Sequence, residues 1–97
     1  MGTIAVIDYG MGNLHSVAKA LQKVAPSKLI IITSNKKKIK NAERIVLPGV
    51  GALGDCKNAL VERGLEKVIL ENANDKPTLA ICVGMQILLE QLLHFAR

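Results

Sequence analysis

The sequence predicts an α/β fold, in which a parallel β-sheet carries helices on both faces. Short apolar runs rich in β-branched residues recur at residues 3–7, 29–33, 44–47 and 78–81. Stretches with helical periodicity separate these runs, so strands and helices alternate along the chain. Runs that are apolar throughout are typical of strands buried on both faces, and right-handed crossovers make consecutive strands parallel. The turns that follow the strands should therefore share one edge of the sheet.

The first half of the chain is expected to contribute three strands and two helices. The first strand leads into a turn, after which Asn13 can cap a helix. Pro26 ends this helix, which carries apolar residues at helical spacing: Leu14, Val17, Ala18, Leu21 and Val24. After the second strand, Ser34 or Asn35 can cap a short lysine-rich helix that ends before the third strand.

The second half is expected to contribute helices, the fourth strand and a final helix. Residues 54–63 have a helical pattern, and Gly64 is its stop signal. Residues 65–72 continue helically until the segment 75–77, which contains a proline, breaks the helix. The fourth strand follows, and a helix at 84–90 begins almost at once after it. We find no internal repeat or linker, so the chain is expected to be a single domain.

The composition is that of a globular chain and disfavours several classes of protein. Hydrophobic residues make up 49% and charged residues 22% of the 97 residues. No apolar run approaches the roughly 20 residues needed to cross a bilayer, and no signal-peptide pattern is visible at the N-terminus. The two cysteines, Cys56 and Cys82, do not make a disulfide framework, which favours a reducing, cytoplasmic location.

The net charge of +5 comes largely from one cluster, Lys36, Lys37, Lys38 and Lys40. Such a cluster could bind phosphate or nucleic acid. No arginine or aromatic residue is interleaved with these lysines, however, so a solvated face of a surface helix is the favoured interpretation. With only two aromatic residues in the chain, base stacking is not expected, and neither nucleic acid nor a membrane is an expected partner.

The stretch that carries the most chemical information is residues 78–86. A strand turns into a helix within two residues here, with Cys82 at the corner, which is the pattern of a nucleophile elbow. The small residues Ala80 and Gly84 flank the corner and allow strand and helix to approach closely. A helix N-terminus next to Cys82 would lower the pKa of the thiol. The alternative is a buried cysteine at the end of a core strand, and residue types alone leave both open.

Three segments resemble one enzyme family. The sequence Ile-Cys-Val-Gly-Met-Gln at 81–86 is similar to the nucleophile motif of class I glutamine amidotransferases. The segments Asp-Tyr-Gly-Met-Gly-Asn-Leu-His-Ser at 8–16 and Ile-Val-Leu-Pro-Gly-Val-Gly-Ala at 45–52 resemble the glutaminase subunits of imidazole glycerol phosphate synthases. The resemblance runs from residue 4 to about residue 90. It implies a flavodoxin-like amidotransferase fold, of which residues 1–97 would form a partial domain that is truncated after the elbow helix.

The resemblance also implies a mechanism. Cys82 would attack the side-chain carboxamide of glutamine, the substrate. The backbone N–H of Val83 and the loop formed by Gly49, Val50 and Gly51 would hold the tetrahedral oxyanion. Glycine in that loop would let the backbone approach the substrate and reorient.

The remaining implied roles concern substrate and partner. Gln86 would contact the glutamine substrate. Ammonia would pass to a cyclase subunit in a heterodimer that serves histidine biosynthesis, and Tyr9 and Asn13 would lie at the interface with that cyclase. No cofactor and no metal is implied. The strand that ends at Cys82 should lie at or near a sheet edge, so self-association is also expected.

Two glycine-containing segments allow another interpretation. Residues 49–54 match G-x-G-x-x-G, the pattern of a dinucleotide-binding turn. They follow the third strand rather than the first, however, and the next strand ends at Cys82 where an acidic residue would be needed. The segment 8–13 could suggest phosphate binding, but His15 stands where a third glycine is expected, and a glycine-rich turn is favoured.

The catalytic histidine and glutamate that the resemblance implies, as a His-x-Glu motif, are absent from the 97 residues. The two histidines are His15 and His94, and His94 would lie about 18 Å from Cys82 along the same helix. Three hypotheses follow: a truncated glutaminase without turnover, a non-catalytic module that docks on the cyclase, and a nucleotide-binding protein or small enzyme of another function.

Overall fold

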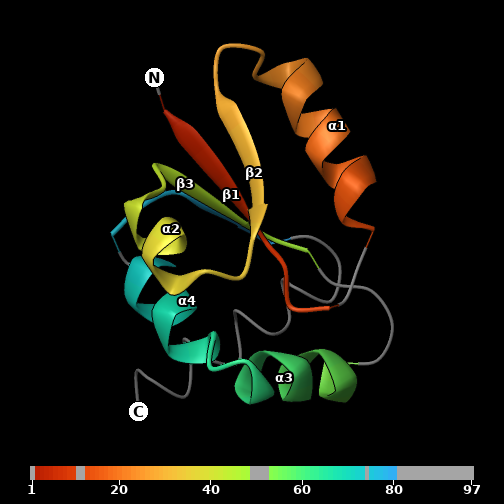
Figure 1. Cartoon of the computed structure of the whole chain (residues 1–97), viewed down its shortest axis with the longest axis vertical. Helices are drawn as coiled ribbons and strands as arrows, with labels where there is room; N and C mark the ends of the chain where they lie inside the picture. The colour runs from red at the N-terminus through yellow and green to blue at the C-terminus, as the bar shows by residue number, and fades with distance from the viewer. Residues whose placement is uncertain (1, 11–12, 49–52, 74, 81–97) are drawn as a thin grey trace.

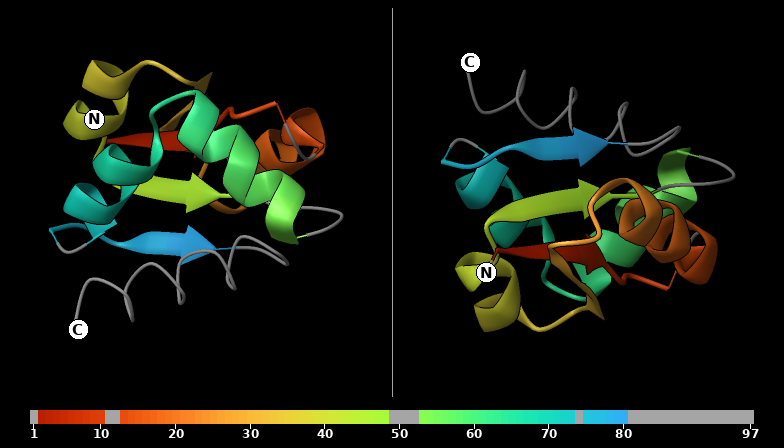
Figure 2. Two further views of the ribbon diagram at one scale, coloured as in Figure 1. Left: turned by 90° about the horizontal axis from the view of Figure 1, so that it is seen from below. Right: turned by 90° about the horizontal axis from the view of Figure 1, so that it is seen from above.

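The structure, a computed structural model, describes residues 2–10, 13–48, 53–73 and 75–80 (Figure 1). In these ranges one four-stranded parallel sheet has the strand order β2-β1-β3-β4. Its strands are β1 (Thr3–Ile7), β2 (Leu29–Thr33), β3 (Arg44–Leu47) and β4 (Thr78–Ala80). In Figure 2 the arrows of β1, β3 and β4 lie side by side and point the same way. The predicted parallel α/β fold is confirmed.

The helices cover both faces of the sheet, as predicted. They are α1 (Leu14–Val24), α2 (Lys36–Asn41), α3 (Leu53–Glu62) and α4 (Glu66–Ala73). On one face, α1 packs through Leu14, Val17 and Leu21 against apolar residues of the strands. On the other face, α2, α3 and α4 contribute the remaining core, and Figure 1 shows them apart from α1. All but one of the largest fully buried side chains among the described residues belong to this second cluster, and the exception is Val6.

The strand order places β1 and β3 in the middle of the sheet. Val6 of β1 pairs with Ile32 on one side and with Val46 on the other. From β1 the chain continues to β2, which lies at one edge of the sheet. It then crosses to the other side of β1, where β3 and β4 follow. The direction therefore reverses between β1 and β3, and in such sheets binding sites lie beyond the carboxyl ends of the strands at that point.

Local sequence signals explain where the helices begin. The Asn13 side chain accepts a hydrogen bond from the Ser16 backbone N–H, at 3.3 Å, and caps α1. Of the two candidates for the second cap, Asn35 is the one used, because its Oδ1 accepts from the Lys38 N–H at 3.0 Å. Val24, which was expected in the apolar stripe of α1, is 80% exposed because it is the last residue of the helix.

The expected elbow helix and Cys82 lie outside the described residues, as does the glycine segment 49–52. In the part of the chain that the structure describes, no helix combines the length and hydropathy that a membrane span requires.

Candidate active site

The carboxyl ends of β3 and β4, the strands that precede two of the predicted active-site segments, lie next to each other. Leu47 of β3 pairs in register with Ala80 of β4. Each of these residues lies two positions before a predicted site residue, Gly49 in one case and Cys82 in the other. Adjacent strands lie about 4.8 Å apart. The strands before the two segments therefore end at neighbouring positions on the same edge of the sheet, as the elbow hypothesis requires.

Six of the predicted site residues lie outside the described ranges: Gly49, Val50, Gly51, Cys82, Val83 and Gln86. Their roles in nucleophilic attack, oxyanion binding and substrate binding stay predictions. The described residues of this edge are the turn after β1, Pro48 after β3, and the first residues of α1.

Tyr9 lies at the centre of this edge and is fully buried. Its hydroxyl group donates a hydrogen bond to the backbone carbonyl of Pro48, so it bridges the ends of β1 and β3. Burial, and then a hydrogen bond with the side chain of Cys56, raise the pKa of Tyr9 above its ordinary value. The phenol is therefore neutral and acts as a hydrogen-bond donor at any physiological pH.

The burial of Tyr9 was not anticipated from the sequence, although a signal was present. Side chains two residues apart in an extended segment point to the same side, and Tyr9 follows the buried Ile7 at this spacing. Both side chains belong to the core cluster with α2, α3 and α4. The side chain of Tyr9 thus faces the core in this chain, while the hypothesis that its segment contacts a cyclase stays a prediction.

Asn13, the other predicted interface residue, is exposed, and its side chain caps α1. The turn before it is held locally, since Asp8 Oδ1 accepts a hydrogen bond from the Gly10 N–H at 3.1 Å. Gly10 has a φ of 85°, and a Cβ there would lie 2.7 Å from Nη2 of Arg63. The positive φ therefore explains this glycine without a bound phosphate.

Cys56, the other cysteine of the chain, is fully buried in α3 and belongs to the same core cluster as Tyr9. The four lysines of the charged cluster are exposed on or next to the surface of α2, in keeping with a solvated helix face. Among the described residues no group of three or more His, Cys, Asp or Glu could hold a metal ion.

A groove of about 530 Å³ lies elsewhere, at the amino ends of the strands. Ile4, Arg44 and Thr78, each near the start of its strand, help to line it together with Leu21 of α1. It is thus at the opposite edge of the sheet from Tyr9 and Pro48. Ligand sites of parallel α/β sheets lie at the carboxyl ends, so this groove is not the candidate active site.

Comparison with known proteins identifies the family. The model of the family "Glutamine amidotransferase class-I" matches residues 5–93. The "Imidazole glycerol phosphate synthase subunit HisH" of Pseudomonas savastanoi pv. phaseolicola is 53% identical over 91 residues, which are 94% of this chain and 42% of that protein. The subunit of the same name from Dechloromonas aromatica is 56% identical over 88 residues, which are 91% of this chain and 41% of that protein.

The chain therefore spans less than half the length of the curated relatives that it matches. The matched region begins within β1 and contains β2, β3, β4 and the helices between the strands, together with the predicted nucleophile segment. From this match and from the parallel sheet with its converging carboxyl ends, it follows that the chain belongs to the class-I glutamine amidotransferase family.

Proposed function

We propose that the chain forms the N-terminal part of a glutaminase that supplies ammonia to the cyclase of an imidazole glycerol phosphate synthase. The observation that carries the proposal is the identity of about half of the residues to relatives named as subunit HisH of that enzyme. The pairing of Leu47 with Ala80 supports it, because the strands that precede the expected oxyanion and nucleophile segments are neighbours in the sheet. The dinucleotide interpretation has no comparable support.

In this mechanism Cys82 is the nucleophile. Its thiolate attacks the carboxamide carbon of glutamine, and the oxyanion accepts hydrogen bonds from the Val83 N–H and the segment 49–51. The carbon–nitrogen bond then breaks, ammonia leaves with an added proton, and a thioester remains. Water hydrolyses the thioester to glutamate and restores the thiol. Gln86, one turn further on, binds the substrate.

The proton donor for the departing ammonia is not evident in the 97 residues. The two histidines are His15 and His94, and neither is followed two residues later by glutamate. His15 is exposed in the first turn of α1. We therefore assign the general acid to polypeptide that corresponds to the rest of the relatives' length, and general acid catalysis typically contributes about 10²- to 10⁴-fold to the rate.

The partner in this proposal is a cyclase subunit that receives ammonia in a heterodimer, in the cytoplasm. Asn13 and the turn that contains Tyr9 form part of the surface that faces it. The missing His–Glu pair favours a second function for the 97 residues taken alone, which is docking on the cyclase without turnover. Titration of a cyclase with the chain would measure that docking independently of glutamine hydrolysis.

The test of the proposed nucleophile is the relative reactivity of the two thiols. A helix N-terminus lowers the pKa of Cys82 if the elbow forms, whereas the fully buried Cys56 is shielded from reagents. Iodoacetamide at neutral pH is therefore expected to label Cys82 well before Cys56, as measured by mass spectrometry of peptides. Cys56→Ala and Cys82→Ala serve as matched controls. Faster labelling of Cys56 in the folded chain would contradict the elbow.

A further inference from the structure

We propose that Arg63 and Lys36 extend the surface that faces the cyclase, and that they bind acidic side chains of that partner. The inference rests on the proposed function, because that function makes a cyclase the partner of the turn after β1. It adds to this surface two cations that are distant from the turn in the sequence but lie at the same edge of the sheet.

The side chain of Arg63 lies directly against the turn after β1. Arg63 follows the last residue of α3, and a Cβ added at Gly10 would lie 2.7 Å from its Nη2 and 3.4 Å from its Cζ. Gly10 lies between Tyr9 and Asn13, the two residues predicted at the cyclase interface. A guanidinium group is thus continuous with the surface that the proposed function assigns to the partner.

Lys36 is positioned near the same edge by the end of β2. It is the first residue of α2, which Asn35 caps, and the Asn35 N–H donates to Oγ1 of Thr33 at 3.0 Å. The Thr33 carbonyl accepts the first backbone N–H after β1, at 2.9 Å, so the carboxyl ends of β1 and β2 are joined. The Lys36 Nζ atom lies 3.1 Å from the position of a Cβ at Gly64. Lys36 therefore lies over the turn between α3 and α4, from which Arg63 extends.

The charges of both side chains are available to a partner. Both residues are exposed, and in the described part of the chain neither side chain has an ion pair or a hydrogen bond. Asp8, the acidic residue of the turn, accepts the Gly10 N–H at 3.1 Å rather than pairing with Arg63. Arginine offers a planar fork of donors that matches a carboxylate. In a chain of net charge +5, acidic side chains are therefore the groups that this surface fits.

Titration of a cyclase subunit with the 97-residue chain, followed by surface plasmon resonance, tests the inference. We expect Arg63→Gln to weaken binding about three- to tenfold at about 0.05 M salt, mainly through slower association. The difference should shrink at about 0.5 M salt, where exposed charges are screened. Lys36→Gln is expected to weaken binding about two- to fivefold. Arg63→Lys should recover part of the loss, because it keeps the charge but not the planar fork.

Arg44→Gln and Lys37→Gln are the matched controls. Arg44 is an exposed arginine at the start of β3, at the opposite edge of the sheet, and Lys37 is an exposed lysine that follows Lys36 in α2. Each replacement should change binding by less than about twofold. Urea unfolding checks the fold of every variant, and Lys36→Gln and Arg63→Lys carry the test if Arg63→Gln does not fold.

Three results would overturn the inference. Equal losses in all four glutamine variants would show that net charge controls binding. Tighter binding of a DNA duplex than of the cyclase, reduced equally by Lys36→Gln and Lys37→Gln, would indicate a nonspecific surface for polyanions. Cyclase binding that Arg63→Gln and Lys36→Gln leave unchanged would contradict the inference but not the proposed function. An unaltered chain that does not bind the cyclase at any salt concentration would contradict the docking part of the proposed function as well.

Discussion

At the scale of single residues, the ionisation of Tyr9 reports directly on its environment. The chain contains one tyrosine and no tryptophan, so tyrosinate absorbance comes from Tyr9 alone. Burial, followed by the hydrogen bond with Cys56, raises its pKa in the folded state. The unfolded chain, with a pKa near 10, therefore binds fewer protons than the folded chain above that pH. This contribution to stability is complete below about pH 10 and is lost as pH rises.

We predict that Tyr9 does not titrate in the folded chain near pH 10. Stability should be independent of this group below about pH 10 and then fall by about 1.4 kcal/mol per pH unit. Tyrosinate absorbance should consequently appear only together with loss of the far-UV circular dichroism signal. Tyr9→Phe should remove this part of the pH dependence. Reversible ionisation near pH 10 with the dichroism signal unchanged would show that Tyr9 is not buried as described.

Individual contacts differ in whether they can be predicted from the sequence. Asn13 and one of the two candidates for the second cap were predicted, because capping depends on side chains within three residues. The bridge from Tyr9 to Pro48 spans 39 positions in sequence, and its existence depends on β1 lying next to β3. No local pattern contains that information. The predicted site residues at 49–51 and 82–86 came from motifs, and the structure leaves them untested.

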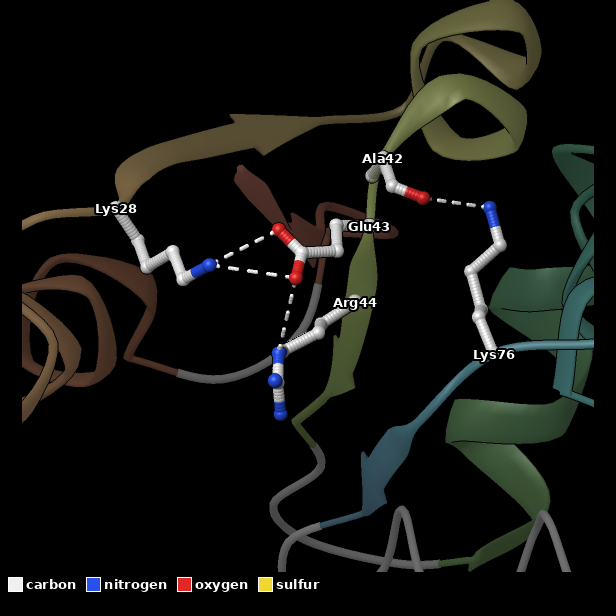
Figure 3. A network of polar contacts seen from close by, with 5 residues as sticks. All are labelled: Lys28, Ala42, Glu43, Arg44 and Lys76. Atoms are coloured by element: carbon white, nitrogen blue, oxygen red, sulfur yellow. Dashed lines mark hydrogen bonds and ion pairs between the residues drawn. The ribbon is translucent and has the colours of Figure 1, made fainter. Parts of the chain in front are cut away.

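At the scale of elements, Lys76 joins three parts of the fold. Its ammonium group donates to the carbonyls of Lys40 at 2.6 Å, Ala42 at 2.7 Å and Ile39 at 3.3 Å. The last carbonyls of a helix have no partner within the helix, and a cation is favoured at that end. Figure 3 shows Lys76 reaching from the segment before β4 to Ala42, which precedes β3. The lysine thus ties the end of α2 and the start of β3 to the start of β4.

We predict that Lys76→Met lowers the free energy of unfolding by about 1–3 kcal/mol, because three carbonyls lose a charged donor. Lys67→Met is the matched control. Lys67 is an exposed lysine of α4 for which the described part of the chain shows no hydrogen bond or ion pair, and its replacement should change stability by less than about 0.5 kcal/mol. Urea unfolding measures both. Equal effects of the two substitutions would contradict the role of Lys76.

The other polar network in Figure 3 should contribute less. Lys28 Nζ lies 3.1 Å from Oε2 of Glu43, and Arg44 Nε lies 3.8 Å from Oε1. The hydrogen bond from Lys28 holds the pKa of Glu43 below its ordinary value. These side chains are substantially solvated, and ion pairs of this kind contribute little and are screened by salt.

The types of the described elements, and most of their ends, were predicted from the sequence. The four apolar runs became strands, because a run that is apolar throughout must be buried on both faces. The third and fourth helices begin and end within about one residue of the expected positions. The exposure of Val24 was missed, because helical spacing continues to the end of α1 although its last residue is 80% exposed.

At the scale of the whole molecule, β4 is an edge strand of the described sheet. Leu79, in the middle of β4, is 52% exposed, and it helps to line the groove at the amino ends of the strands. An apolar edge strand without charge invites pairing with another chain. The expected position of this strand at an edge is thus confirmed for the described residues, whereas association itself stays a prediction.

We predict that the 97-residue chain self-associates at micromolar concentration, and that Leu79→Lys reduces this association because a charge would be buried in the contact. Val61→Lys is the matched control, because Val61 is exposed to a similar extent, 56%, but lies on α3. Sedimentation velocity over a range of concentrations measures both variants. A single monomeric species in the unaltered chain, with a cooperative thermal transition, would contradict the prediction.

Taken as a whole, the 97 residues explain the fold and the family, but they do not supply the proposed general acid. Fold and family were predictable, because the strands and the three motifs lie within the 97 residues. In the proposed function the general acid comes from elsewhere, since the relatives extend well beyond the matched region and the chain has no His-x-Glu motif. We propose that Cys82 and the glycine segment form a functional half of a glutaminase site.

Ammonia release from glutamine tests this claim most directly. The chain would be assayed alone and after mixing with a separately produced polypeptide that contains the remainder of the Pseudomonas savastanoi relative, beyond the matched 91 residues. The matched segment of that relative, mixed with the same remainder, is the positive control. The account predicts no ammonia from the chain alone, and ammonia from the mixture that Cys82→Ala abolishes. Cys82-dependent ammonia from the chain alone, or an inactive mixture beside an active positive control, would contradict it.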